Sequence, residues 1–107
     1  MSLNKMIIDT LKPLGVPVAF QTYEGKEKTY ITFFEYNQFS ALNADDEEQQ
    51  TAHFFQIDIW SKTDYTDLTQ QVKERMIAAG FRRTSEVDLF EQETKTYHKA
   101  IRFSYVG

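Results

Sequence analysis

Two histidines are the first residues whose chemistry could define a site. His53 and His98 both fall in stretches where apolar and polar residues alternate, a pattern that predicts β-strands. A zinc site needs three or four ligands at short spacing, and neither histidine has such neighbours in the sequence. We therefore interpret both as ordinary strand residues and predict no metal site.

The densest charge lies in residues 43–50, which read Asn-Ala-Asp-Asp-Glu-Glu-Gln-Gln. This segment has no apolar periodicity, so we expect a solvated loop. It also lacks the glycine that a calcium-binding loop requires. Alternatively, Asp45, Asp46, Glu47 and Glu48 could steer an encounter with a basic partner surface, and the loop would become ordered on docking.

The remaining motifs point to no reaction and no cofactor. Serines and threonines occur without a nucleophile elbow or a neighbouring base. The 4 glycines are scattered and form no phosphate-binding loop. The absence of cysteine excludes disulfides and thiolate metal ligands. The residues alone thus favour a non-enzymatic protein without cofactor, with a small ligand-binding or enzymatic α+β domain as a further reading.

Length and composition predict a single folded domain over residues 1–107. The hydrophobic content of 41% and the charged content of 26% are those of a globular protein. The net charge of -4 argues against a general binder of nucleic-acid backbones. No apolar run reaches the roughly 20 residues of a membrane-spanning helix, and no secretory signal peptide is evident, so the expected compartment is the cytoplasm.

Hydrophobic periodicity predicts the elements that must position these residues. A helix is expected over residues 3–14, because apolar residues recur there at spacings of three and four. A short strand over 18–22 and a polar turn at 24–27 read as one arm and the connection of a hairpin. Aromatic strands over 29–42 and 51–61 follow. On the latter, we expect Asp58 to be the outward member of the alternation.

The second half is predicted as a helix and two strands. The helix over residues 64–79 has Asp64 as its N-cap and Gly80 as its stop. Strands over 81–92 and 96–106 complete an α+β fold with the order α-β-β-β-α-β-β. We expect a mainly antiparallel sheet of about five strands with two helices packed on one face. Lys99 shares a strand face with apolar residues, so it must reach an edge or a partner.

Aromatic and arginine residues are the candidates for protein contacts. Tyr30, Phe34 and Tyr36 share one face of a strand whose other face is also apolar. Either both faces are covered, which favours a subunit contact, or one face is a partly exposed aromatic ladder. Arg82 and Arg83 follow a helix C-terminus, where they complement the helix dipole or bind the acidic segment of another copy.

Several stretches together carry a family resemblance. The strand at residues 55–61, Phe-Gln-Ile-Asp-Ile-Trp-Ser, leads into the helix that ends at Gly80-Phe81. The chain closes with Ala-Ile-Arg-Phe-Ser-Tyr at 100–105 and opens with a helix leading through Leu-Gly-Val-Pro-Val at 14–18. In these stretches and in element order, the sequence resembles the small tail-terminator (tail-completion, head–tail joining) proteins of long-tailed bacteriophages and defective prophages.

The resemblance implies a structural α+β subunit that forms a homo-oligomeric ring, typically a hexamer, at the head-proximal end of the phage tail. Such a ring caps the tail-tube protein, faces the head-connector protein and lets DNA pass without specific binding. Such a ring is assembled in the host cytoplasm. The resemblance implies no catalytic residue, no cofactor, no small-molecule substrate and no membrane. The rival interpretation is a non-viral binding module with an exposed aromatic sheet. We expect the contact surfaces to include Tyr30, Phe34, Tyr36, Asp45, Asp46, Glu47, Glu48, Trp60, Arg82 and Arg83.

Overall fold

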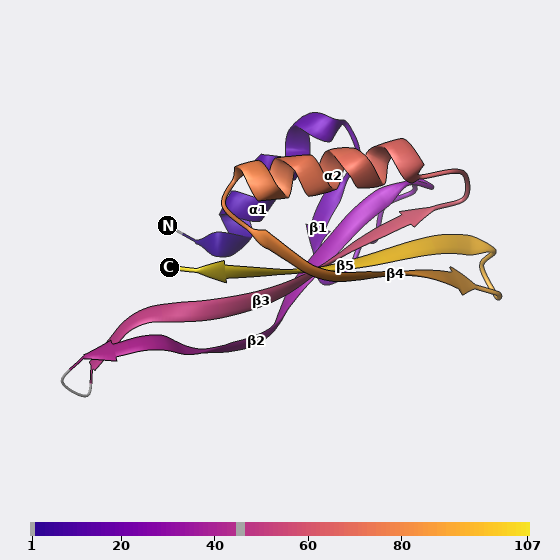
Figure 1. The fold of residues 1–107 in the computed structure, drawn as a ribbon. Helices are drawn as coiled ribbons and strands as arrows, with labels where there is room; N and C mark the ends of the chain where they lie inside the picture. The colour runs from indigo at the N-terminus through magenta and orange to yellow at the C-terminus, as the bar shows by residue number, and fades with distance from the viewer. Residues whose placement is uncertain (1, 45–46) are drawn as a thin grey trace.

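A five-stranded sheet in the order β1-β2-β3-β5-β4 is the frame of the molecule (Figure 1). The computed structural model describes residues 2–44 and 47–107, apart from the side chains of 41–44 and 47–49. The strands are β1 (Val18–Phe20), β2 (Tyr30–Ala44), β3 (Glu47–Ser61), β4 (Arg82–Glu91) and β5 (Thr96–Val106). With the helices described next, this confirms the α+β class and the predicted element order.

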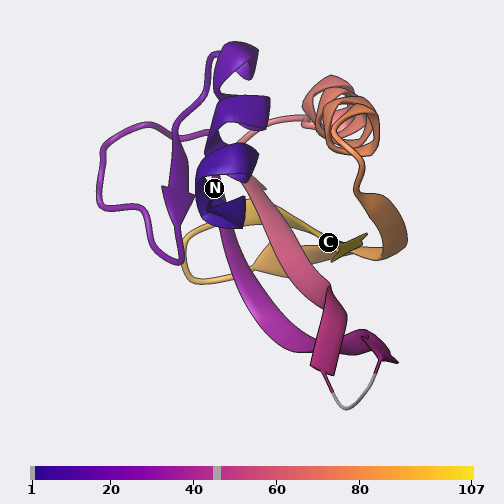
Figure 2. The ribbon, with the colours of Figure 1, turned by 90° about the vertical axis from the view of Figure 1, so that its left-hand side faces the viewer.

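Both helices cover the same face of the sheet (Figures 1 and 2). Helix α1 (Leu3–Leu11) continues into the 3-10 turn η1 (Lys12–Leu14), and α2 (Thr66–Ala78) follows β3. Apolar residues at helical spacing point to the sheet. The core that they form with the strands consists of Ile7, Leu11, Ile31, Phe33, Phe55, Ile57, Ile59, Val72, Met76, Phe81, Ile101 and Phe103.

The termini of α2 follow from local hydrogen bonding. Asp64 Oδ1 accepts hydrogen bonds from the backbone N (2.9 Å) and Oγ1 (2.6 Å) of Thr66, and these bonds lower the pKa of Asp64. The helix therefore starts two residues after the predicted boundary, and its N-cap is Tyr65 instead of the predicted Asp64. It ends before Gly80, whose φ of 103° suits a residue without Cβ. In the described part of the chain, neither helix is long and apolar enough to cross a membrane.

The predicted β1–β2 hairpin is wrong. Val18 lies opposite Ile31 and Phe20 opposite Phe33 in a parallel pair. Because parallel neighbours require the chain to return along the strand, residues 21–29 form a crossover instead of a tight turn. Gln21, at φ 63°, starts this crossover, and its N–H donates to the carbonyl of Phe33 at 2.8 Å.

The predicted loop over residues 43–50 is also wrong. Strands β2 and β3 run into this segment, with Asn43 opposite Glu48 and Ala44 opposite Glu47; residues 45–46 lie outside the described chain. Backbone hydrogen bonds can hold two strands together even where their side chains show no apolar periodicity. This explains why the sequence pattern predicted a loop. We call residues 37–44 and 47–54 the arm. Residues 52–54 at its base still pair with β5, and beyond them the two strands extend past the rest of the sheet in a molecule that measures 52 × 26 × 24 Å (Figure 1).

Candidate contact surface

In the described part of the chain, no helix covers the sheet face opposite α1 and α2 (Figures 1 and 2), and we call it the open face. Residues opposite each other in an antiparallel pair share a face, so the register shows on which face of the sheet each side chain lies. Ile31, Phe33 and Ile57 face the helices and are buried. Tyr30 and its partner Trp60 therefore belong to the open face. Two interpretations of β2 were open: both faces covered, or one face a partly exposed aromatic ladder. The single chain has the partly exposed ladder.

Aromatic rings form a fixed platform at one end of the open face. Trp60 stacks on His98 with 3.8 Å between ring centroids and an interplanar angle of 14°. Its Nε1 donates to Thr32 Oγ1 at 3.0 Å. The ring of Tyr30 lies 6.1 Å from that of Trp60, and burial, followed by the charge of Glu91, raises the pKa of Tyr30. The platform is thus ordered before any partner arrives.

A polar cluster occupies the middle of the open face. Asp58 lies on this outward face, as the alternation predicts, but it is only 4% exposed. Its Oδ1 lies 2.6 Å from Nε2 of His98 and accepts a hydrogen bond from Gln56 Nε2 at 2.8 Å. Arg102 Nε donates to Gln56 Oε1 at 3.2 Å. The carboxylate is buried because its cross-strand neighbours surround it.

The aromatic surface continues from the open face onto the arm. The Arg102 guanidinium lies 4.5 Å from the ring centroid of Tyr36. Phe54 links Tyr36 and Phe39, at 6.1 Å and 5.3 Å between centroids. Tyr36 is 37% exposed and Phe39 is 53% exposed. On the opposite side of the arm base, His53 Nδ1 lies 2.6 Å from Glu35 Oε2. The arm therefore has an aromatic side and a polar side.

The structure brings only some of the expected contact residues together. Tyr30, Phe34 and Trp60 lie on the open face, and Tyr36 lies where the arm begins. Arg82 and Arg83 begin β4, and both are exposed. Arg82 lies opposite Ser104, and Arg83 Nη1 lies 3.1 Å from Glu86 Oε1 of its own chain.

The acidic segment lies elsewhere, and only part of it is described. Asp45 and Asp46 fall outside the described residues. The backbones of Glu47 and Glu48 begin β3, in the part of the arm farthest along the strand from the body.

Several exposed apolar residues were missed as contact candidates. Phe39 extends the aromatic side of the arm, while Val87 and Leu89 are 51% and 47% exposed. The register places Val87 opposite Ala100 and Leu89 opposite His98, on the open face. Their alternation with Glu86 and Asp88 was a usable sequence signal. Which of the two sets would face solvent depended on the pairing with β5, which the sequence does not specify.

A second feature is a groove of about 840 Å³ between the N-terminal half of α2 and strands β4 and β5. Lys99 was expected to reach either an edge or a partner, and it reaches the edge strand β4. Its Nζ lies 2.9 Å from Glu86 Oε2 and 3.2 Å from Asp88 Oδ1. Lys73 Nζ lies 3.1 Å from Glu86 Oε1, and Tyr65 donates its O–H to Asp88 at 2.7 Å. These contacts tie α2 to β4 and β5.

The pairing of Glu86 predicts a pH-dependent stability. The hydrogen bond from Lys99 is the main cause that holds the pKa of Glu86 below its ordinary 4.5 in the folded chain. The stabilisation that this pairing gives the folded chain is therefore complete above the ordinary pKa of 4.5. It is lost as the pH falls through the lower pKa of the folded state. Between about pH 7 and about pH 3, we expect the wild type to lose roughly 1 kcal/mol more unfolding free energy than Glu86→Gln.

Urea unfolding at a series of pH values measures this difference. The control is Glu74→Gln on the exposed side of α2, where Gln70 Nε2 donates to the carboxylate at 3.1 Å. The control should follow the wild-type curve. Parallel curves for the wild type and Glu86→Gln would contradict the prediction.

Comparison with known proteins supports the resemblance seen in the sequence. A family model described as "Tail completion protein gp17" matches residues 14–106. A solved chain from "Virion of native gene transfer agent (GTA) particle" has the same fold, with a TM-score of 0.67 at 12% identity. The alignment covers 96% of this chain and 92% of that chain. No curated protein sequence matches. The predicted family is thereby confirmed.

Proposed function

Because this chain belongs to the family of the tail completion protein gp17, we propose that it forms a ring that caps the phage tail tube and joins it to the head connector. The family makes it a structural protein of a phage tail, which points to a non-enzymatic role. The observation that supports the ring is the open face, whose exposed apolar side chains continue along the arm. Apolar surface of this extent is typical of sites that meet other proteins.

The edges of the sheet are poorly suited to assembly. Strand β1 has 3 residues and follows Pro17, which has no N–H to donate. Strand β4 carries charged residues along its length and has an irregular register between Arg83 and Ser85. Short strands, charges and bulges are devices that keep edges from pairing with other chains. We therefore assign the subunit contacts to the faces and the arm instead of the edges.

A closed ring needs a heterologous contact, in which two different patches of each subunit meet. We assign one side of that contact to the aromatic residues Tyr30, Phe34, Tyr36 and Trp60. Arg82 and Arg83, with the acidic segment that contains Asp45, Asp46, Glu47 and Glu48, supply charges of opposite sign. Encounters between subunits would be steered by these charges and weakened by salt.

The proposed ring would assemble in the bacterial cytoplasm and remain in the virion. A hexamer is the expected size, with the tail-tube protein on one side and the connector on the other. DNA would pass through the hole without specific binding. The net charge of -4 favours such passage, since a basic surplus would bind the phosphate backbone.

Growth of tail tubes tests this proposal. Purified tail-tube protein of the same phage is polymerised with and without this chain, and tube length and end structure are measured by electron microscopy. We expect shorter tubes whose ends carry a ring of this protein. Tubes of unchanged length and bare ends would show that the proposed capping role is wrong.

A matched pair of variants localises the contact. Tyr36→Glu places a charge on the aromatic surface and should weaken capping about tenfold or more, as for a residue inside an interface. Ile77→Glu is the control, because Ile77 is 54% exposed on α2 and lies on the helix side of the sheet. Equal capping by the two variants would remove the open face from the proposed contact surface.

A further inference from the structure

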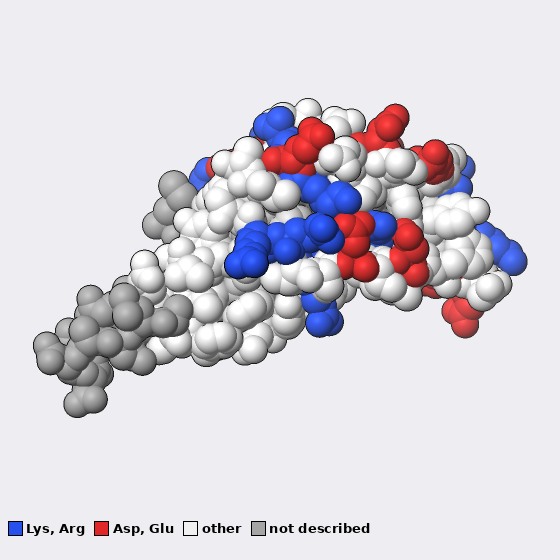
Figure 3. All heavy atoms as spheres, viewed as in Figure 1, with Lys and Arg blue, Asp and Glu red and all other residues white. Residues whose placement is uncertain are grey.

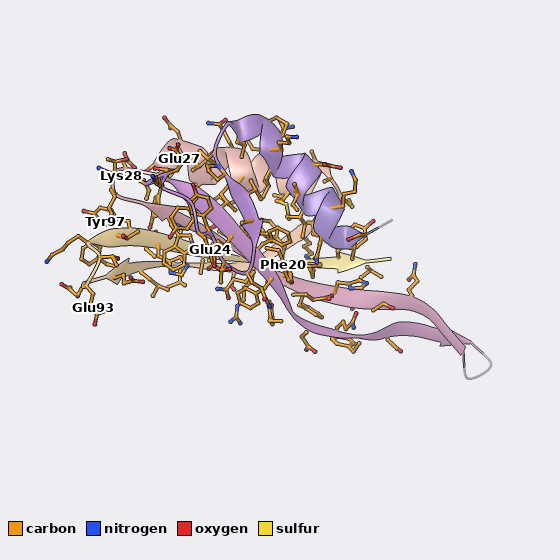
Figure 4. All side chains as sticks on the ribbon, turned by 180° about the vertical axis from the view of Figure 1, so that it is seen from behind. Phe20, Glu24, Glu27, Lys28, Glu93 and Tyr97 are labelled. Carbon is orange, nitrogen blue, oxygen red and sulfur yellow. The ribbon has the colours of Figure 1, made fainter. Side chains whose placement is uncertain are left out.

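One backbone edge of the arm has no neighbouring strand. Strand β1 pairs with β2 only from Ile31 to Phe33, although β2 continues to Ala44. In the described part of the chain, no other strand lies on that side of β2. Figure 4 shows Phe20, the last residue of β1, at the point where the arm leaves the body. We call the backbone of residues 35–40, on the side away from β3, the arm edge.

The register shows which backbone groups point outward from the arm edge. In an antiparallel pair, opposite residues either bond to each other or both point away. The N–H of Gly107 donates to the carbonyl of Thr51 at 3.1 Å. The backbone groups of Thr51 therefore point to β5, and so do those of His53, two residues on. Gln38 lies opposite His53, so its N–H and C=O point away from β3, into a position that β1 does not reach.

The arm edge lacks most of the devices that keep strand edges from pairing with other chains. Residues 35–40 read Glu-Tyr-Asn-Gln-Phe-Ser, with no lysine, proline or glycine. The one charged residue, Glu35, has His53 Nδ1 at 2.6 Å from its Oε2. Register shifts lie on both sides of residues 37–40, which themselves pair regularly with β3. On the face shown in Figure 3, charged side chains gather on the body, and the described surface of the arm is uncharged.

Other copies of this chain are poor occupants of the arm edge in a ring. Pairing of the same edge in two copies is a two-fold contact, which cannot continue around a ring. Pairing with the β3 side of a neighbouring arm would place two acidic stretches, residues 45–48 of each copy, side by side, and like charges on adjacent strands repel. The other edges of a copy are the short β1 and the charged β4. Symmetry and charge therefore favour a strand of a different protein.

The growing end of the tail tube is the occupant that fits the proposed function. The end of a polymer exposes the contact that its next subunit would fill, and a cap must occupy that contact. The arm extends farthest from the body (Figure 1), so an incoming strand reaches its edge without obstruction by the helices. Phe39, 53% exposed, flanks this position on the aromatic side of the arm and offers an apolar surface to the side chains of the strand.

We propose that an extended strand of the tail-tube protein adds to the arm edge and bonds to the outward N–H and C=O of Gln38. This contact rests on the proposed capping of the tube, for which it names the partner segment. Main-chain hydrogen bonds supply the affinity in strand addition, and neighbouring side chains such as that of Phe39 supply the specificity.

Hydrogen exchange at two neighbouring amides tests the added strand. The N–H of Phe39 bonds within the arm, because Phe39 lies opposite Ala52 in a hydrogen-bonded pair, whereas the N–H of Gln38 points away from β3. Capped tubes are exchanged into deuterium oxide and dissociated, and the released chain is measured by NMR. On capping, we expect the exchange of Gln38 to slow about tenfold or more relative to that of Phe39. An arm that only becomes more rigid would slow both amides equally.

A matched pair of variants tests the same hydrogen bond through capping. Gln38→Pro removes the N–H, and proline is tolerated in an edge strand whose N–H faces solvent. Gln38→Ala keeps the N–H and is the control. We expect Gln38→Pro to weaken capping about tenfold, while Gln38→Ala caps like the wild type. Circular dichroism and the exchange of Phe39 check that the arm of each variant is intact.

The outcomes separate this contact from the proposed function. Capped tubes in which Gln38 exchanges as fast as in the free chain, or equal capping by the two variants, would overturn the contact alone. Protection of Gln38 in this protein without tube protein would identify a second copy as the occupant and would also overturn it. Protection by tube protein without shortened tubes would confirm the contact and overturn the capping role. No binding to tube protein would overturn both.

Discussion

Phe33→Ala is expected to lower the free energy of unfolding by about 3–5 kcal/mol, the range for a truncated core phenylalanine. Phe33 is 0% exposed at the centre of β2, and Phe20 packs edge-on against its ring at 5.6 Å. Removal of the ring loses its transfer free energy and leaves a cavity between α1 and the sheet. Urea unfolding followed by tryptophan fluorescence measures the change.

Phe39→Ala is the matched control, since it removes the same side chain from the same strand. Phe39 is 53% exposed on the arm, so the isolated chain should lose only about 0.5 kcal/mol. The prediction for Phe33 would fail if the two variants unfolded at the same urea concentration. The contrast also separates roles, because Phe39→Ala should impair capping while leaving the subunit folded.

Asp58→Ala is expected to lower the unfolding free energy by about 3 kcal/mol, because removing one member of a buried pair leaves the other unpaired. The lost carboxylate is the partner of both His98 and Gln56. We expect the stacking of His98 on Trp60 to loosen as well, since the 2.6 Å contact to Asp58 fixes the imidazole. Unfolding experiments and the near-ultraviolet circular dichroism of Trp60 measure the two effects.

Glu35→Ala provides the comparison for a more exposed pair. The side chains of His53 and Glu35 are 16% and 30% exposed, so their contact contributes about 1 kcal/mol or less. A loss for Asp58→Ala no larger than that for Glu35→Ala would show that the polar cluster does not stabilise the open face.

Elements with a complete local signal were predictable from the sequence. The last strand was expected over residues 96–106, and β5 spans Thr96–Val106. Helix α2 was also predicted, because its apolar stripe, the acidic residues at its start and Gly80 at its end agree. These signals act within a few residues of each other, so they do not depend on the rest of the fold.

Features that depend on pairing between distant strands were not predictable. Trp60 and His98 stack, and Asp58 is buried, only because β3 and β5 pair in one register. The parallel course of β1 depends on the crossover at 21–29, whose polar sequence is equally compatible with a turn. The arm is held by backbone hydrogen bonds, for which side-chain patterns carry little information.

The register irregularity at Tyr36 has a consequence for how the contact surface is encoded. Side chains of a regular strand alternate, so Phe39 would lie on the opposite side from Phe34 if β2 had no extra residue. Glu35 lies opposite Phe55, but Asn37 lies opposite Phe54 and Phe39 opposite Ala52. The inserted residue thus shifts the phase of the alternation by one. Two stretches that are out of phase in sequence thereby present a single aromatic surface, and deletion of Tyr36 alone would turn the arm's aromatic side away from it.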